Sequence, residues 1–153
     1  MRRKDKEIFG RENIERVIRQ ASYGVLGLVD GRKPYVVPLN FGYSDQIFYF
    51  HSAVNGRKIK TIRKNSLGCI SLVAHAAVKK ARIACGWGTA YVSVFVEGRI
   101  REITGAAEKI KALRIIMQQY SRKKKWDFSA AMIDAVRVYC LKTTTLTCKR
   151  SGE

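Results

Sequence analysis

The sequence predicts a mainly β fold with helices: a small six-stranded antiparallel barrel that forms a single domain over residues 1–153. Six runs rich in β-branched and aromatic residues are separated by short turn sequences, which is typical of antiparallel strands. The connections between these runs are short, and the helical patterns are set among them, which favours a small antiparallel barrel decorated by helices. The 46% hydrophobic content suffices to bury one core, and closure into a barrel would remove exposed strand edges.

The N-terminal part predicts one helix followed by a three-stranded meander. An amphipathic helix is expected over 11–21, since apolar residues recur there at spacings of three and four. Strands follow at 23–29, 34–43 and 46–52, divided by the turn sequences DGRK and SD. Pro38 has no N–H to give to a strand ladder, so it is expected at a sheet edge or a bulge, where a ligand can approach the backbone.

The central part predicts a helix and two long strands. A helix over 55–64 leads into 67–78, a nearly continuous apolar run that is expected to be a buried strand. After a looser segment, 90–103 is expected to be a long strand in which Gly98 marks a bulge or bend.

The C-terminal part predicts a second long helix and the last strand. The helix is expected over 105–121, because its apolar residues form one stripe at helical spacing. A basic loop, SRKKKWD, and a short helix, SAAMIDAV, then lead to a strand over 136–149. These segments complete the six strands of the predicted barrel.

The charge of the chain restricts the classes of partner. The 30 Lys and Arg residues outnumber the 12 Asp and Glu residues, which gives a formal net charge of +18 at pH 7. Such a charge favours anionic partners, including nucleic acid, phosphorylated cofactors and acidic membrane surfaces, without choosing among them. The basic start lacks an apolar segment behind it, and no stretch approaches the roughly 18 apolar residues that cross a bilayer. We therefore expect a cytoplasmic protein with no membrane partner.

The cysteines and histidines predict no metal site. Cys69, Cys85, Cys140 and Cys148 show neither C-x-x-C spacing nor nearby paired histidines, so reduced and mostly buried thiols are expected. His75 lies inside an apolar run and is expected to be a core residue.

The stretch FHSAVNGRKI, residues 50–59, predicts the end of a strand, a tight turn at the Asn-Gly pair and the start of a helix. Arg57 and Lys58 then occupy the first helical turn, where unpaired N–H groups disfavour cations unless an anion is bound. If Ser52 or Asn55 caps this helix, N–H groups, a hydroxyl and two cations converge as they do in phosphate sites. Adjacent cations also arise by chance in so basic a chain, so the pattern alone leaves the phosphate site open.

Other basic stretches favour simpler interpretations. KIKTIRKN is typical of a solvated helix face, and SRKKKW of a charged loop anchored by one buried Trp rather than of a nucleic-acid groove. GRKI lacks the upstream Gly of a P-loop, and no G-x-G-x-x-G follows a predicted strand, so a nucleotide fold of the Rossmann type is not indicated.

The order of segments PYVVPLNFGY, FYFHSAVNGRKIKTI, ACGWGTAYVSVFVEGRI and AAEKIKALRIIMQQY resembles the pyridoxamine 5'-phosphate oxidase-related flavoproteins. The nitroimidazole-resistance (Nim) branch is the more similar, and the resemblance covers nearly the whole chain. It implies an FMN-binding split β-barrel that forms a homodimer, with FMN held in two symmetric sites at the subunit interface.

The resemblance also implies a set of site residues. Arg57 and Lys58 match the Arg-Lys pair that holds the FMN phosphate, and Ser52 matches the hydroxyl residue beside it. His51 matches the histidine of the Nim-like FHSA or FHGA motif, close to the flavin, and Ser93 falls where a partner strand touches the cofactor. The strand whose backbone lines the flavin ring matches Val37, Pro38, Leu39 and Asn40.

The function implied by the resemblance is that of a flavin-dependent oxidoreductase reducing a small electrophile such as a nitroaromatic, with His51 as a proton donor. Tyr35 and Asn40 stand where the true oxidases carry an Arg and a Lys around the phosphate, which disfavours oxidation of pyridoxamine phosphate. Two alternatives stay open. One is a non-catalytic module that holds FMN, haem or another anionic ligand, and the other, less favoured despite the basic charge, is a nucleic-acid-binding domain.

Overall fold

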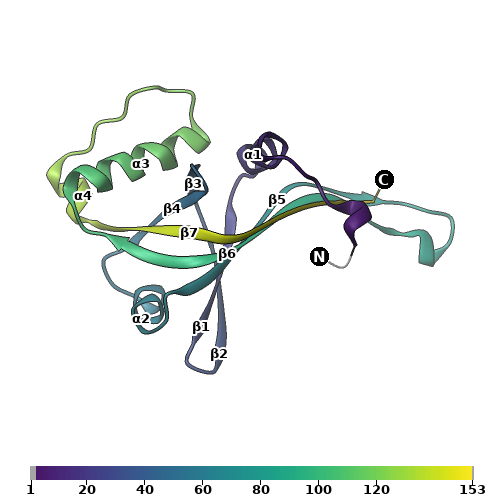
Figure 1. Cartoon of the computed structure of the whole chain (residues 1–153), viewed down its shortest axis with the longest axis horizontal. Helices are drawn as coiled ribbons and strands as arrows, with labels where there is room; N and C mark the ends of the chain where they lie inside the picture. Colours follow the sequence, from purple (N-terminus) through teal and green to yellow (C-terminus); the bar gives the residue numbers. More distant parts are fainter. Residues whose placement is uncertain (1–2, 153) are drawn as a thin grey trace.

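The computed structural model describes residues 3–152. Seven antiparallel strands form one sheet in the order β2-β1-β5-β6-β7-β4-β3, and helices lie around it (Figure 1). Helices α1 and α3 lie on one side of the strands in this view, and α2 lies on the other. In chain order the elements are η1 (Lys4–Lys6), α1 (Arg11–Gln20), β1 (Gly24–Asp30), β2 (Lys33–Leu39), β3 (Phe41–Ser44), β4 (Ile47–Ala53), α2 (Arg57–Lys64), β5 (Leu67–Lys79), η2 (Ala84–Gly86), β6 (Gly88–Ile103), α3 (Ala106–Tyr120), α4 (Ala130–Asp134) and β7 (Val136–Ser151).

The predicted strand at 34–43 is two strands, which is why the sheet has seven strands and not six. The ladder is interrupted at Asn40, where the chain leaves β2 and enters β3. β2 pairs with β1 and β3 pairs with β4, so this one run of sequence supplies both edges of the sheet. The expectation that Pro38 lies at a sheet edge is confirmed, because β2 is an edge strand.

Side chains from all seven strands meet in one core, so the sheet wraps around it even though no ladder joins β2 to β3 among the described residues. Helices α1 and α2 close the core with Ile18 and Ile59. Each such side chain stabilises the fold by about 1.5–3 kcal/mol through removal of its apolar surface from water. The buried strand residues include Leu26, Leu39, Phe41, Phe48, Phe50, Ile70, Leu72, Val94, Val96 and Leu141. The predicted mainly β fold with helices is confirmed.

Two glycines permit close packing in this sheet. A Cβ at Gly42 would lie 2.6 Å from the backbone of Ile115, so α3 packs directly onto β3. The register of β6 against β7 shifts between Glu97 and Gly98, which confirms the bulge expected at Gly98.

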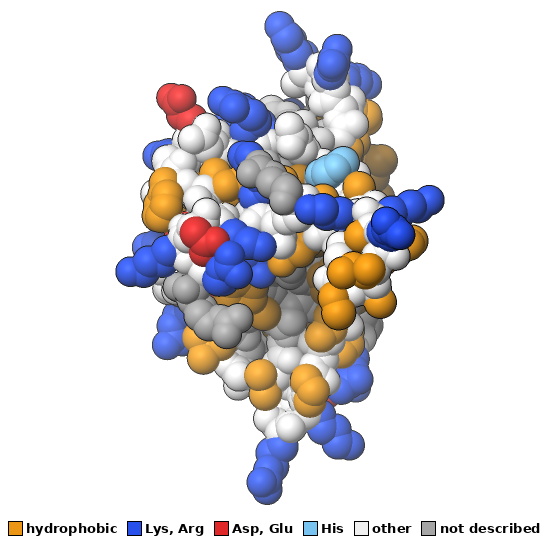
Figure 2. All heavy atoms as spheres, turned by 90° about the vertical axis from the view of Figure 1, so that its right-hand side faces the viewer, with side chains coloured by type: hydrophobic (Ala, Val, Ile, Leu, Met, Phe, Trp, Pro, Cys, Tyr) orange, Lys and Arg blue, Asp and Glu red, His pale blue; other side chains and the backbone are white. Residues whose placement is uncertain are grey.

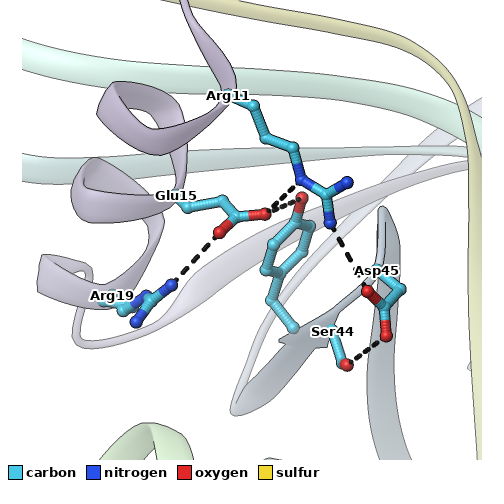
Figure 3. A network of polar contacts seen from close by, with 6 residues as sticks. Arg11, Glu15, Arg19, Ser44 and Asp45 are labelled. Carbon is cyan, nitrogen blue, oxygen red and sulfur yellow. Dashed lines mark hydrogen bonds and ion pairs between the residues drawn. The ribbon is translucent and has the colours of Figure 1, made fainter.

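Helix α1 is tied to the β3–β4 hairpin by a polar network (Figure 3). Glu15 accepts hydrogen bonds from Arg11 Nε at 2.9 Å and Arg19 Nη2 at 3.1 Å, and Arg11 Nη2 also reaches Asp45 Oδ1 at 3.4 Å. Tyr43 donates its hydroxyl to Glu15 at 3.5 Å. Hydrogen bonding and charge from Arg11, with a smaller contribution from Arg19, lower the pKa of Glu15. The network fixes the position of α1 on the sheet without burying a charge.

Strands β5, β6 and β7 extend beyond the rest of the sheet as a long arm (Figure 1). The expectation of a buried strand at 67–78 holds only for its first part, since side chains from Val73 onward are mostly exposed. His75, expected in the core, is exposed, and that prediction is wrong. His75 is exposed because the arm runs past the core. On the arm, Val73 and Val78 are also 50% and 66% exposed. Figure 2 shows hydrophobic side chains exposed between Lys and Arg side chains on the face at this end.

The cysteines are free thiols. Cys140 and Cys148 are buried, Cys69 is half-buried and Cys85 is exposed, so only Cys85 departs clearly from the expected burial. Within residues 3–152, no helix has the length and apolar content that crossing a membrane would require.

Candidate functional site

The turn between β4 and α2 leaves the start of α2 uncapped. Gly56 is the N-cap residue, with a φ of 137° that side-chain-bearing residues rarely adopt, and no side chain accepts a hydrogen bond from the first turn. Neither Ser52 nor Asn55 caps the helix, so the convergence considered for a capping hydroxyl or amide is not formed here. The first turn contains Arg57 and Lys58 and no acidic residue. Uncapped N–H groups and two cations together favour an anion at this end of the helix.

Arg57 is held by two neighbours outside α2. Its Nε donates to Asp30 Oδ2 at 3.0 Å, and its guanidinium carbon lies 4.4 Å from the centre of the Tyr35 ring. The Arg57 side chain is 51% exposed, so it stays accessible from solvent while it is held.

Lys58 and His51 form a second pair beside the same turn. Lys58 Nζ donates to the carbonyl oxygen of His51 at 3.4 Å, and burial lowers the pKa of Lys58. Partial enclosure by the protein, and secondarily the charge of Lys58, lower the pKa of the His51 imidazole. His51 is therefore mainly neutral at neutral pH while a cation lies close to it.

A hollow of about 340 Å³ brings together five of the residues predicted from the sequence. Its wall consists of the end of β2 and the residue after it, the outward face of β4 and the first turn of α2. Tyr23, next to β1, is a sixth member that sequence reasoning did not identify, because an aromatic residue at a strand end carries no distinguishing signal. The hollow is lined by Tyr23, Pro38, Leu39, Asn40, His51 and Lys58.

Four predicted site residues do not line this hollow. Arg57 lies beside it in the first turn of α2, and the other three face different parts of the fold. Ser52 is buried, on the face of β4 opposite to His51, because successive strand residues point to opposite faces. Val37 packs against the core. Ser93 lies on β6 and lines a separate hollow of about 480 Å³ on the arm, with Val73, Tyr91, Phe95 and Lys149 among its other residues. One chain alone thus does not bring Ser93 to His51 and Lys58.

A larger hollow of about 590 Å³ contains none of the predicted site residues. It lies between the N-terminal segment and the β5–β6 hairpin, next to Lys6, Trp87 and Ser151. Lys6 Nζ donates to Ser151 Oγ there at 3.2 Å. The uncapped helix start with Arg57 and Lys58, and not the volume of the hollow, therefore distinguishes the candidate site.

Comparison with known proteins agrees with this fold. A family model described as pyridoxamine 5'-phosphate oxidase matches residues 10–150. A solved structure from Bacteroides thetaiotaomicron, named as a candidate 5-nitroimidazole antibiotic resistance protein, is 29% identical with a TM-score of 0.81, over 96% of this chain and 90% of that chain. No curated protein matches the sequence.

Two further structures share the fold at lower identity. The flavocytochrome Anf3 from Azotobacter vinelandii has a TM-score of 0.85 at 20% identity, over 100% of this chain and 72% of that chain. An FAD and haem binding protein from Mycobacterium smegmatis has a TM-score of 0.83 at 16% identity, over 97% of this chain and 74% of that chain. These likenesses confirm the split-barrel class expected for the sheet, and the family model covers most of the sequence. The chain belongs to the pyridoxamine 5'-phosphate oxidase family.

Proposed function

We propose that this protein is a flavoprotein that binds FMN beside the start of α2 and uses it to reduce a small electrophile of the nitroaromatic type. The observation that carries the proposal is the uncapped first turn of α2, with Arg57 and Lys58, next to a hollow that contains His51. Relatives of similar fold include a flavocytochrome, an FAD and haem binding protein and a candidate 5-nitroimidazole resistance protein, which supports a flavin as the ligand.

The residues present fit a flavin phosphate and ring. A phosphate requires cations and N–H donors, which Arg57, Lys58 and the uncapped helix start supply. A flat ring requires an open, mainly uncharged wall, which Pro38 and Leu39 at the end of the edge strand β2 supply together with Asn40, the next residue. The volume of about 340 Å³ lies within the roughly 300–1,000 Å³ typical of small-molecule sites.

The complete site in this proposal is shared by two subunits. Val73 and Phe95 are exposed on one face of the arm beside Ser93, although apolar residues on a strand face are normally covered. Packing of this face against a second copy would cover them and would bring Ser93 of one subunit to the cofactor of the other. A homodimer thus explains both the exposed arm and the distance of Ser93 from the rest of the site.

The chain's own residues then have distinct roles. The flavin, when bound, supplies the transfer of electrons. Arg57 and Lys58 would bind its phosphate, and the β2 edge would orient its ring. His51, which lines the hollow, would donate a proton to the reduced substrate from the minor protonated fraction that its lowered pKa leaves at neutral pH. Tyr23 would exclude water from the open side of the hollow.

The absorbance spectrum of the purified protein tests the proposed function. A band at about 450 nm that NADH or NADPH bleaches is the expected result for a redox-active flavin. A haem spectrum without that band would instead support a non-catalytic or haem-binding module. Colourless protein that does not acquire the band with added FMN, and that shifts DNA with a steep salt dependence, would support the nucleic-acid alternative.

A further inference from the structure

Asp30 is one of two residues, with Tyr35, through which the β1–β2 hairpin contacts Arg57 at the start of α2. It is the last residue of β1, and its carboxylate accepts the Nε–H of Arg57 at 3.0 Å. The Asp30 side chain is only 27% exposed, which is low for a carboxylate beside a turn. A negative charge so close to a proposed anion site requires an explanation, since it repels the anion that Arg57 is proposed to bind.

The geometry of the contact supplies that explanation. Arg57 has five N–H donors in a planar fork, and Asp30 engages the group at Nε. Within residues 3–152, the terminal nitrogens of Arg57 make no hydrogen bond to the protein. Stacking on Tyr35, at 4.4 Å, restricts the plane of the fork. Asp30 and Tyr35 thus fix the guanidinium and leave its terminal edge, which is the edge that grips two phosphate oxygens, unoccupied.

We propose that Asp30 is a positioning residue that orients Arg57 and thereby sets the preference of the site for phosphorylated over unphosphorylated flavin. This inference rests on the proposed function. A free arginine side chain loses rotamer entropy when it binds a phosphate, and one already held in place loses less. A phosphate bound at the terminal nitrogens of Arg57 would have the guanidinium between it and Asp30, which reduces the repulsion between the two negative charges.

Two substitutions separate orientation from charge. Asp30→Asn removes the charge but keeps an oxygen that can accept the Nε–H of Arg57. Asp30→Ala removes both the charge and the acceptor. If orientation is the function of Asp30, only Asp30→Ala should weaken the preference for a phosphate. Asp45→Ala is the matched control, because Asp45 is also a turn carboxylate paired with an arginine, Arg11, away from the site.

The experiment is a titration of FMN and of riboflavin into each flavin-free variant, followed by quenching of flavin fluorescence. The measured quantity is the ratio of the riboflavin Kd to the FMN Kd. Asp30→Ala should lower this ratio about tenfold, which is the size of one oriented, charge-assisted hydrogen bond. Asp30→Asn and Asp45→Ala should leave it within about threefold of the unsubstituted protein.

A double-mutant cycle tests whether Asp30 acts through Arg57. The ratio for Asp30→Ala/Arg57→Ala should equal that for Arg57→Ala alone, because Asp30 has nothing left to orient. An unchanged or raised ratio in Asp30→Ala, or additive losses in the double variant, overturns the inference. If Asp30→Ala does not fold by circular dichroism, Asp30→Val and Asp30→Leu, which also lack a side-chain acceptor, replace it in the same cycle. Failure of the unsubstituted protein to bind FMN would overturn the proposed function itself. If the unsubstituted protein binds FMN and Asp30→Ala leaves the ratio unchanged, only the inference about Asp30 is overturned.

Discussion

Arg137 on β7 holds the turn that precedes α2, because its Nε donates to the carbonyl oxygen of Val54 at 2.8 Å. The same guanidinium donates through Nη1 to Glu102 on β6. Arg137, which is 83 residues after Val54 in the sequence, thus fixes the backbone beside the proposed phosphate site. Arg137 lies opposite Ser52 in the β4–β7 ladder, which places it next to the turn.

Arg137→Ala should therefore weaken FMN binding although Arg137 does not line the hollow. Loss of the bond to Val54 frees the turn, and a half-buried hydrogen bond to a charged group is worth about 1.5–3 kcal/mol of stability. We expect a lower midpoint of thermal unfolding together with a several-fold higher Kd for FMN. Arg137→Lys is the control for charge, since an ammonium lacks the fork that reaches both partners. Equal FMN affinity in Arg137→Ala and the unsubstituted protein would show that the turn does not depend on this contact.

The lowered pKa of His51 gives a second prediction. Enclosure by the protein is its first cause and the charge of Lys58 is its second. In NMR titrations of the flavin-free protein, His51 should titrate below the roughly 6.5 of a free imidazole, and Lys58→Met should raise its pKa. His75→Gln identifies which of the two histidine signals belongs to His51. The prediction fails if Lys58→Met lowers the pKa of His51 or leaves it unchanged.

The role of His51 in catalysis is tested separately from its pKa. His51→Ala should leave FMN bound but slow the reduction of a nitroaromatic by about 100-fold or more, as expected on removal of a general acid. Because the protonated form donates, the rate for the unsubstituted protein should fall as pH rises through the lowered pKa of His51. Unchanged turnover at unchanged flavin content would leave His51 with a packing role only.

The exposed arm predicts a homodimer. Phe95→Glu and Val73→Asp should each convert the dimer to a monomer in sedimentation velocity at micromolar concentration, because each places a charge on the face proposed to be buried. Met132→Asp is the matched control, since Met132 is also an exposed apolar residue but lies on α4. A monomeric unsubstituted protein that binds FMN would contradict this prediction.

The sequence predicted those parts of the fold where one local pattern dominates. Helices at 11–21 and 105–121 carry strong helical periodicity, and both were located within one or two residues. The break at Asn40 was not predicted, because the run 34–43 has strand composition throughout and only the tertiary structure sends its two halves to opposite edges. The exposure of β5 beyond Val73 was also missed, since an apolar run does not distinguish burial within the chain from an uncovered face.

The candidate site was predictable in its sequence-local parts only. The Arg-Lys pair at the start of a helix is a local signal. The alternation of strand residues could have shown that Ser52 and His51 face opposite sides. Asp30 reads in the sequence as a simple turn residue, and nothing local shows that it contacts Arg57, 27 residues away. Contacts of this kind depend on the sheet register, which single-sequence patterns do not determine.

The most direct test of the account is the affinity of Arg57→Ala, Lys58→Ala and Lys64→Ala for FMN and for riboflavin. Arg57→Ala and Lys58→Ala should weaken FMN binding by about 10- to 150-fold, with the larger loss in Arg57→Ala, because each charge-assisted bond contributes about 1.5–3 kcal/mol. Riboflavin, which lacks the phosphate, should bind these variants almost as it binds the unsubstituted protein. Lys64→Ala, at the far end of the same helix, should change neither affinity. If Lys64→Ala weakens FMN binding as much as Arg57→Ala does, the start of α2 is not the phosphate site.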